Sequence, residues 1–259
     1  MKILITGHKG FIGSNAVQRF SDRHKVHTHE WEDGDLPSVK KYDWVMHFGA
    51  ISSTTERDVA KIMRQNYDFS VELYRECRHH AVNFQFSSSA SVYGLLDEFE
   101  EDSPVDPRTP YAWSKYMFEH YVKQHPPRHS VAQLFRYFNV YGPGEDHKGT
   151  QASPQHQFTM QALQTGKIRV FENSDRYHRD FVHVDRVLGV HEAMLKSDAT
   201  GVFNVGTGQT QSFLDVAKGI AEEYEAKIEY IPMPDILKDS YQTYTCADLT
   251  HLNNTLEKI

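Results

Sequence analysis

A serine, a tyrosine and a lysine stand in an order and at a spacing that could move protons to and from an alcohol. Ser89 follows a strand-like segment, and Tyr111 comes 22 residues later, at the start of a predicted helix. Tyr111 and Lys115 are four residues apart, so they share one helical face. We expect the lysine ammonium to lower the pKa of the phenol, while Ser89 hydrogen-bonds the same substrate oxygen.

A glycine-rich turn near the N-terminus could bind the cofactor that oxidation of an alcohol requires. The strand-like residues 2–6 run directly into Gly7, Gly10 and Gly13, and helical spacing follows. Such glycines permit a tight turn and close approach of a pyrophosphate, whose charge the helix N-terminus stabilises. An ordinary strand-to-helix turn would also fit, but the place of the turn in a first βαβ unit favours a dinucleotide. Glu30, after the second strand, is expected to bind the adenosine ribose.

The elements that position these residues alternate along the first half of the chain. Apolar segments of strand length alternate with amphipathic segments of helix length, which predicts an α/β fold with a doubly wound, Rossmann-type parallel sheet. The expected strands are 2–6, 25–29, 44–48, 83–87 and 131–137, and the expected helices are 11–21, 58–80 and 111–124. We expect an NAD(P)-binding Rossmann domain over 1–141 and mainly a smaller substrate-binding lobe over 142–259, with segments of about 175–210 returning to the first domain.

The composition excludes several classes of protein. The 259 residues are 39% hydrophobic and 24% charged, enough for the core of one or two domains. A net charge of −7 and the lack of a Lys/Arg block argue against nucleic-acid binding. Apolar runs fall far short of the roughly 20 residues of a membrane span, and no signal peptide is visible, so we expect a cytoplasmic protein without a membrane partner. The two cysteines and 16 histidines form no ligand pattern, so no metal is expected.

The glycine turn and the Ser89, Tyr111 and Lys115 set together resemble the extended short-chain dehydrogenase/reductases, the NAD-dependent epimerase/dehydratase family that acts on nucleotide sugars. Within this family the chain is most similar to the epimerases that invert carbon 6 of an ADP-linked heptose destined for lipopolysaccharide. The resemblance covers nearly the whole chain. The segments that carry it are 47–56, 136–143, 147–149, 152–153, 179–182, 203–208, 231–235, 241–242 and 247–249.

The resemblance implies a cofactor, NAD or NADP, and the residues that bind it. They are Gly7, Gly10, Phe11, Ile12, Gly13, Glu30, Asp35, Leu36, Phe48, Gly49, Ala50, Ser52, Asn66, Tyr111, Lys115, Val140 and Lys148. Asp35 and Leu36 would reach the adenine from the end of a further strand, although relatives have a longer segment here. The choice between NAD and NADP stays open, because Glu30 would repel a 2′-phosphate whereas Lys40 or Lys41 could offset that repulsion.

The resemblance also makes Lys148 a second catalytic base, on the side of the sugar carbon opposite Tyr111. Epimerisation would transfer a hydride transiently to a tightly bound NAD(P) and return it to the other face, so two differently placed proton acceptors are useful. The implied substrate-binding residues are Ser89, Asn139, Thr150, Gln157, Phe171, Glu172, Asn173, Ser174, Arg179 and Tyr241. Arg179 would bind the diphosphate, unless it pairs with Asp180 or Asp185 at the surface.

Three functions remain open at this point. The first is a nucleotide-sugar epimerase, most specifically an ADP-heptose 6-epimerase. The second is another extended-family enzyme, such as a UDP-hexose 4-epimerase or a deoxysugar reductase, and the third is an NAD(P)-binding protein without catalysis. Sugar dehydratases carry an Asp-Glu pair after the catalytic serine or threonine, but this chain has Ala90 and Ser91. By resemblance we also expect a homo-oligomer that associates through segments 58–80 and 111–124.

Overall fold

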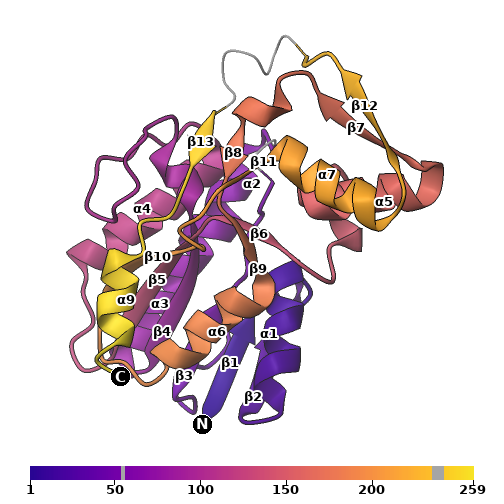
Figure 1. The fold of residues 1–259 in the computed structure, drawn as a ribbon. Coiled ribbons are helices and arrows are strands. Elements are labelled where there is room, and N and C mark those ends of the chain that lie inside the picture. Colours follow the sequence, from indigo (N-terminus) through magenta and orange to yellow (C-terminus); the bar gives the residue numbers. More distant parts are fainter. Residues whose placement is uncertain (54–55, 235–241) are drawn as a thin grey trace.

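Six parallel strands form the main sheet in the computed structural model, which describes residues 1–53, 56–234 and 242–259 (Figure 1). The strands are β1 (Lys2–Thr6), β2 (Lys25–His29), β3 (Trp44–His47), β4 (Asn83–Ser89), β5 (Ala132–Tyr137) and β10 (Gly201–Val205). Their order across the sheet is β10-β5-β4-β3-β1-β2, and each neighbouring pair is parallel. The first five lie where the sequence predicts strands, and the predicted Rossmann-type α/β fold is confirmed.

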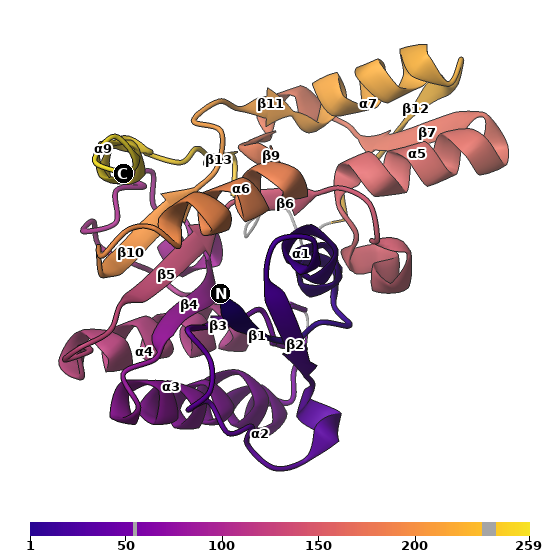
Figure 2. The same ribbon diagram turned by 90° about the horizontal axis from the view of Figure 1, so that it is seen from below.

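Helices cover both faces of this sheet, as Figure 2 shows. They are α1 (Phe11–Ser21), α2 (Val59–Ile62), α3 (Phe69–His79), α4 (Pro110–Gln124), α6 (Val184–Met194) and α9 (Thr250–Leu256), with a π-helical segment, Met63–Asp68, between α2 and α3. Successive residues of a strand point to opposite faces of the sheet, and the apolar side chains of β1 are buried on both faces because helices cover both. Leu4 packs with Leu73 of α3, whereas Ile3 and Ile5 pack with Phe20 of α1 and Leu188 of α6.

The strand order reverses between β1 and β3, and β2 is the edge of the sheet. Only residues 30–43 join β2 to β3, and this fully described connection holds a 3-10 turn, η1 (Trp31–Asp33), but no strand. A parallel crossover to an additional strand takes a dozen or more residues by itself, so this segment is too short for a crossover and a strand. The connection therefore holds no strand that could present Asp35 and Leu36, as the shortness of this segment indicates, and their contact with the adenine stays a prediction.

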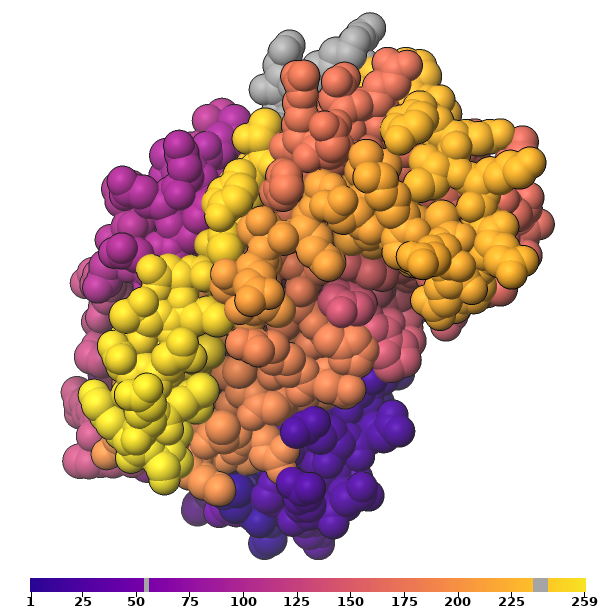
Figure 3. Space-filling model, in the orientation of Figure 1, coloured from indigo at the N-terminus to yellow at the C-terminus, as the bar shows by residue number. Residues whose placement is uncertain are grey.

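A second, smaller group of elements stands out from the sheet (Figures 1 and 3). It comprises α5 (Pro154–Thr165), β7 (Lys167–Phe171), α7 (Phe213–Glu223) and β12 (Lys227–Ile231). β7 and β12 pair in parallel, and the two helices share one hydrophobic cluster with them. Between these segments the chain returns to the main sheet through α6 and β10.

Short elements connect the sheet to this lobe. They are β6 (Asn139–Tyr141), β8 (His178–Arg179), β9 (Phe181–His183), β11 (Gln211–Ser212), β13 (Tyr244–Thr245) and the 3-10 turns η3 (Ala90–Tyr93), η4 (Asp146–Gln151) and η5 (Ser174–Arg176). β6 pairs with β9, and β8 lies between β11 and β13. Within the described ranges, no helix combines the length and apolar character that crossing a membrane requires, and no cluster of His, Cys, Asp or Glu could hold a metal ion.

Candidate functional site

The glycine turn after β1 packs so closely that two of its glycines are required by the fold itself. Gly7 has a φ of +76°, and a Cβ placed on it would lie 2.3 Å from the backbone nitrogen of Gly49. A Cβ on Gly13 would lie 2.0 Å from the carbonyl oxygen of Gly7. Any side chain at either position would displace backbone atoms, so these glycines let α1 and the loop after β3 approach the turn.

Gly10 differs, because the protein leaves its Cβ position open. A Cβ there would meet nothing closer than the Gly7 oxygen at 3.4 Å, and the residue is exposed at the N-cap of α1. In this fully described helix, no side chain caps the N-terminus and no acidic residue stands in the first turn. The first N–H groups of a helix have no partners within it. The open backbone and the uncapped helix therefore fit the pyrophosphate of a dinucleotide.

A cavity of about 140 Å³ opens at the carboxyl ends of β1, β2 and β3, beside the glycine turn. Ligands of doubly wound sheets bind at this point, where the strand order reverses. Trp31 and Phe69 meet there edge to face, with 5.4 Å between ring centroids, and offer apolar surface to a planar base. The lining residues are Thr6, Gly7, Glu30, Trp31, Glu32, His47, Gly49, Ala50, Ile51, Gln65 and Phe69. The cavity suits the adenosine half of a dinucleotide.

Glu30 is the acidic residue that ties this cavity to the glycine turn. Its Oε1 accepts a hydrogen bond from the backbone nitrogen of Lys9 at 2.6 Å and lies 3.2 Å from Nδ1 of His8. The carboxylate is thus held at the end of β2, where the sequence places a ribose-binding group. Asp35, by contrast, is exposed, and Leu36 packs against the hydrophobic cluster beneath α3. Neither is among the residues that line the cavity, because no strand in this connection presents them to it.

The loop after β3 supplies the other wall of the cavity. Gly49 and Ala50 line it. Phe48 turns the other way and packs on His191 of α6, with 5.0 Å between ring centroids. Ser52 is exposed at the surface of this loop. Of residues 48–52, the structure therefore brings Gly49, Ala50 and Ile51 to the cavity, and not Phe48 or Ser52.

Asn66, buried on the π-helical segment, fixes this loop to α4. Its side chain accepts a hydrogen bond from the Ile51 nitrogen at 2.8 Å and donates to the Ile51 oxygen at 3.0 Å. It also donates to the Ser114 hydroxyl at 3.2 Å. Ser114 in turn donates to the carbonyl oxygen of Tyr111 at 2.7 Å. Asn66 thus connects the adenosine cavity to the residues predicted to be catalytic, and π-helical turns are frequent at such sites.

Ser89, Tyr111 and Lys115 lie together at the carboxyl end of β4 and the first turns of α4. Thr109 caps α4 by accepting a hydrogen bond from the Ala112 nitrogen, and Pro110 occupies the first helical position, which fixes where the helix starts. The Ser89 side chain hydrogen-bonds the Tyr111 phenol. Lys115 Nζ donates to the Ser87 carbonyl oxygen at 2.7 Å and lies 5.7 Å from the centroid of the Tyr111 ring. Ser89 and Tyr111 can therefore contact one substrate oxygen, with the Lys115 ammonium held near the Tyr111 ring.

The electrostatics of this set differ from the sequence-based expectation. Burial raises the pKa of the Tyr111 phenol, and the hydrogen bond from Ser89 offsets only part of this rise. Burial also lowers the pKa of Lys115 to about 7, against the opposing effect of Glu119. Lys115 is therefore only partly protonated at neutral pH, and the expected lowering of the phenol pKa by a permanent ammonium is wrong for the protein alone.

A buried ion pair behind Lys115 was not foreseen from the sequence. Glu119, one turn along α4, is bound by the Arg136 guanidinium of β5, with Nη2 2.6 Å from Oε2, and both side chains are about 4% exposed. The Ser88 hydroxyl donates to the same carboxylate, and Arg136 lies over the Tyr93 ring. The spacing of Lys115 and Glu119 could have placed Glu119 near Lys115, since residues four apart share a helical face, but no local spacing indicates its pairing with Arg136.

Lys148 lies on η4, in a loop that returns to α1. Its Nζ is 4.9 Å from the centroid of the Phe11 ring, at the first residue of α1, and 2.9 Å from Oε2 of Glu145. Ile12 and Val140 pack on the same side of the sheet, between the clusters beneath α1 and α6. The loop thus brings Lys148 to the N-terminal end of α1, beside the glycine turn. Sequence reasoning did not single out Glu145.

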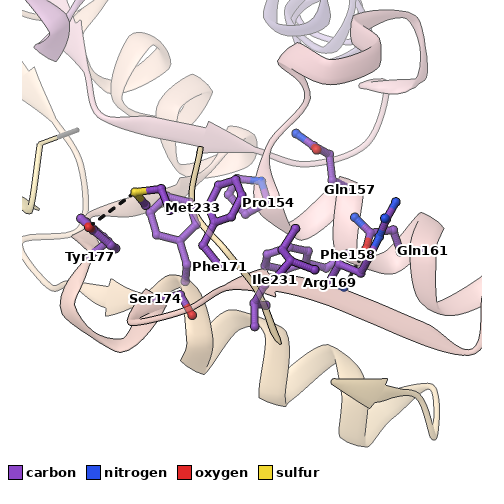
Figure 4. Close-up of a pocket in the computed structure, with 12 residues that line it drawn as sticks. Pro154, Gln157, Phe158, Gln161, Arg169, Phe171, Ser174, Tyr177, Ile231 and Met233 are labelled. Carbon is purple, nitrogen blue, oxygen red and sulfur yellow. Dashed lines mark hydrogen bonds between the residues drawn. The ribbon is translucent and has the colours of Figure 1, made fainter. Parts of the chain in front are cut away.

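A second cavity, of about 380 Å³, lies between α5, β7 and the segment after β12 (Figure 4). Its lining residues are Pro154, Gln157, Phe158, Gln161, Arg169, Val170, Phe171, Ser174, Tyr177, Phe213, Ile231 and Met233. Predicted Gln157, Phe171 and Ser174 are among them. Figure 4 shows Phe171 beside Met233, and Gln157 at the rim. Aromatic walls with a few amides and one arginine suit a nucleoside.

The remaining predicted substrate residues are placed around these two cavities. Glu172 and Asn173 are exposed beside the second one, and Asn173 has a φ of +61°. Asn139 is exposed on β6, and its nitrogen donates to the Asp180 oxygen. Thr150 is exposed on η4, where its carbonyl oxygen accepts from Gln157. Tyr241 lies outside the described residues.

Arg179 is buried rather than at the surface. Its guanidinium donates to the carbonyl oxygens of His178 and Gln242, at 2.8 and 2.5 Å, and lies 5.6 Å from the centroid of the Phe213 ring. Asp180 faces the other way and accepts hydrogen bonds from Thr207, Gly208 and Ala247, and Asp185 lies near His183. Neither carboxylate forms the surface ion pair considered as the alternative. Since Phe213 lines the second cavity, Arg179 stands directly behind its wall.

Comparison with known proteins gives consistent results. A family model described as the NAD dependent epimerase/dehydratase family matches residues 3–206. The ADP-L-glycero-D-manno-heptose 6-epimerase of Helicobacter pylori is 26% identical, with a TM-score of 0.87 over 99% of this chain and 90% of that one. The UDP-glucose 4-epimerase of Thermus thermophilus, solved in complex with NAD, is 25% identical, with a TM-score of 0.83 over 98% and 92%. The UDP-N-acetylglucosamine 4-epimerase of Methanobrevibacter ruminantium is 23% identical, with a TM-score of 0.88 over 98% and 91%.

Proposed function

The chain belongs to the NAD dependent epimerase/dehydratase family, and from this premise we propose that it is an epimerase whose substrate is an ADP-heptose. Membership confirms three sequence-based predictions, namely the family resemblance, an enzymatic function and a nicotinamide dinucleotide as cofactor. The observation that carries the proposal is that the chain offers two separate proton-transfer centres, one at the carboxyl end of β4 and one beside the glycine turn. One centre is Ser89 with Tyr111, and the other is Lys148.

The first centre can accept a proton from a substrate hydroxyl. The Tyr111 phenolate would take that proton, while the Ser89 hydroxyl hydrogen-bonds the same oxygen and holds it in place. Burial raises the phenol pKa, so proton acceptance requires a positive charge nearby, which Lys115 supplies in its protonated form. When bound, the nicotinamide supplies the reversible acceptance of a hydride from the sugar carbon.

The second centre supports inversion rather than a single oxidation or reduction. Lys148 comes from η4 and reaches the site over Phe11 of α1, whereas Tyr111 comes from α4 on the opposite face of the sheet. Two proton-transfer groups on different sides serve an enzyme that removes and restores the same hydrogen on opposite faces of one carbon. Ala90 and Ser91 stand where a dehydratase would need an additional acid and base, which argues against elimination.

The choice of an ADP-heptose rests on the segments around Lys148 and on a similar protein. Residues 52–56 and 147–149 resemble the heptose epimerases, and one protein similar over nearly the whole chain is named as such an enzyme. The second cavity would receive the nucleoside against Phe171 and Phe213, with Arg179 behind it. UDP-hexose epimerases of similar fold make a UDP-sugar the principal competing substrate.

For the cofactor we propose NAD rather than NADP. The Glu30 carboxylate is fixed by Lys9 at the ribose end of the cavity, where it would repel a 2′-phosphate. Lys40 and Lys41 are the residues that could offset this repulsion. The Lys41 ammonium lies over the Tyr42 ring, 5.3 Å from its centroid, and is directed to that ring.

We also propose self-association through α2 and α4. Val59 on α2 and Trp113 on α4 are large apolar residues with about half of their surface exposed, 53% and 49%. Apolar groups exposed on adjacent helices favour a protein–protein contact. Sedimentation of the protein and of a Trp113→Glu variant tests this, because a charge at the contact should shift the protein toward the monomer.

The substrate is tested by incubating the protein with ADP-, GDP- and UDP-sugars and following the stereochemistry by NMR. We expect inversion of an ADP-heptose at one carbon without loss of water. Turnover of UDP-hexoses alone would refute the heptose assignment, and the release of a dehydrated sugar would refute epimerisation. Cofactor binding without any turnover would instead make the chain a non-catalytic NAD(P)-binding protein. Lys148→Ala should lose epimerisation.

A further inference from the structure

Glu145 is a carboxylate with no exposed surface, in a loop that otherwise lies at the surface. Its Oε1 accepts hydrogen bonds from the Gly142 nitrogen at 3.2 Å and from the Ser153 hydroxyl at 2.7 Å. Its Oε2 accepts from the Ser153 nitrogen and the Lys148 ammonium, at 2.8 and 2.9 Å. A buried charge is costly unless it is paired and hydrogen-bonded, and here both oxygens have donors.

These contacts fix the loop at both ends and in the middle. Gly142 begins the loop after β6, and Ser153 caps α5 by accepting a hydrogen bond from the His156 nitrogen. The loop is also attached to α1, because Asn15 donates to the Pro143 oxygen at 2.9 Å. Lys148 is held between the Glu145 carboxylate and the Phe11 ring, and its side chain retains 20% exposure. Its ammonium is therefore confined to one place and still reaches water.

Other charged groups near Lys148 are directed elsewhere. Asp146 is 84% exposed, and its carboxylate lies 4.0 Å from His156 of α5. His183, before α6, faces Asp185 at 3.3 Å. The first turn of α1, which is described in full, contains no acidic residue. Glu145 is thus the carboxylate that faces the Lys148 ammonium directly.

We propose that Glu145 is a positioning residue that holds the Lys148 ammonium at the N-terminal end of α1. This inference rests on the proposed function, and it assigns the order of proton transfers there. Lys148 begins the cycle as the proton donor, and Tyr111 begins it as the acceptor. In one turnover the substrate hydroxyl gives its proton to Tyr111, and the product oxygen receives a proton from Lys148. Exchange with water then removes the proton from Tyr111 and restores that of Lys148, so protons balance.

The ionisation of Glu145 is consistent with this role. Burial acts to raise its pKa, but the hydrogen bonds from Ser153 and Lys148 outweigh burial and hold the pKa below its usual value. Glu145 therefore stays ionised at neutral pH, and its carboxylate pairs with the Lys148 ammonium 2.9 Å away. Without Glu145 the ammonium would lose the contact that holds it in this place.

The decisive measurement compares how fast acetic anhydride modifies Lys148 relative to Lys123 in the intact protein at one fixed pH, read by mass spectrometry. It needs neither substrate nor activity. In Glu145→Gln the neutral side chain no longer holds the ammonium, so we expect Lys148 to be modified about threefold or more faster than in wild type. For epimerisation we expect kcat to fall about tenfold or more with little change in KM, because a displaced proton donor slows the chemical step rather than substrate binding. Glu145→Asp, which keeps the charge but moves it away from Lys148, should give a smaller change in both quantities, and it serves as the second variant if Glu145→Gln does not fold.

Two control variants separate the ion pair from loop structure. Ser153→Ala removes a hydroxyl donor from the same loop but keeps the carboxylate, so Lys148 should be modified at the wild-type rate. Glu192→Gln makes the same chemical change in an ion pair with Arg19 and Arg23, between α1 and α6, and should also leave the modification rate of Lys148 unchanged. An unchanged rate for Lys148 in folded Glu145→Gln overturns the inference. A faster rate in Glu145→Gln, when the wild-type protein is inactive on every nucleotide sugar, would support the ion pair and refute the proposed function.

Discussion

The side-chain amide of Asn66 donates a hydrogen bond to the Ser114 hydroxyl at 3.2 Å, across the interface between the π-helical segment and α4. Asn66 also binds both backbone polar groups of Ile51. One buried residue therefore sets the distance between the adenosine cavity and the helix that carries Tyr111 and Lys115. The alignment of cofactor and catalytic residues depends on this connection.

Asn66→Ala should therefore affect stability and cofactor binding together. It leaves buried partners unsatisfied on Ile51 and Ser114, and we expect the free energy of unfolding to fall by about 2–4 kcal/mol. Urea titration and dinucleotide binding measure the two effects. Asn83→Ala is the control, because Asn83 makes a comparable side-chain bond, to the Val131 nitrogen, at the far end of β4. That variant should lose about 1 kcal/mol and bind cofactor normally. Equal effects of both variants on binding would contradict the connecting role.

The glycine turn predicts different outcomes for two similar substitutions. Gly13→Ala places a Cβ 2.0 Å from the Gly7 oxygen and should strongly destabilise the fold. Gly10→Ala has room within the protein, so the melting temperature should change little, but the methyl group stands where a pyrophosphate would approach. We expect cofactor affinity to fall about tenfold or more, a loss of about 1.4 kcal/mol.

Thermal melting and isothermal titration with NAD separate these two effects. Gly219→Ala on α7 is the control, since its Cβ would have nothing within 4 Å. Removing a glycine from a helix interior should stabilise the protein by about 1 kcal/mol without altering binding. Unchanged NAD affinity in Gly10→Ala would place the pyrophosphate elsewhere.

The buried ammonium of Lys115 predicts an unusual dependence of stability on pH. Its pKa is lowered from 10.5 to about 7 in the folded protein, so between these values the unfolded chain binds more protons than the folded one. Stability due to this group therefore rises as the pH increases from 7 toward 10.5, and below pH 7 the full penalty is present. Lys115→Met removes the penalty but leaves the Ser87 oxygen without its donor.

We expect Lys115→Met to be more stable than wild type by about 1–3 kcal/mol at pH 7, with the difference shrinking as the pH rises to 9. Activity should be lost. Urea titrations at pH 6.5, 7, 8 and 9 measure this difference, and Lys123→Met, exposed on the same helix, provides the comparison. A pH-independent difference would mean that Lys115 is fully charged in the fold.

Glu30 predicts the cofactor preference. NAD should bind more tightly than NADP. Glu30→Ser should lower the affinity for NAD about tenfold, because a charge-assisted hydrogen bond to the ribose is lost. The difference in affinity between NAD and NADP should become smaller, because the repulsion of the 2′-phosphate is removed as well. Equilibrium binding of both dinucleotides checks this. Glu32→Ser is the matched control, since Glu32 lines the same cavity but its side chain is 71% exposed. A wild-type preference for NADP would be incompatible with the proposed role of Glu30.

The sequence by itself determined the alternation of strands and helices, the glycine turn and the Ser89, Tyr111 and Lys115 set. These are local features: the period of apolar residues fixes an element, and a spacing of four fixes a shared helical face. The sequence also indicated that the segment after Glu30 was short. It could not show that the further strand was absent, since that depends on where the chain crosses the sheet.

Only the tertiary structure decided the environments of these groups. Burial, which no single segment specifies, reverses the expected direction of the Tyr111 pKa and takes the pKa of Lys115 to about 7. The contacts of Glu119 with Arg136 and of Asn66 with Ile51 join residues far apart in the chain. Glu145 could not be distinguished from any other loop carboxylate until folding enclosed it beside Lys148. Local patterns determine which groups are present, whereas packing determines their solvation, their partners and hence their charge.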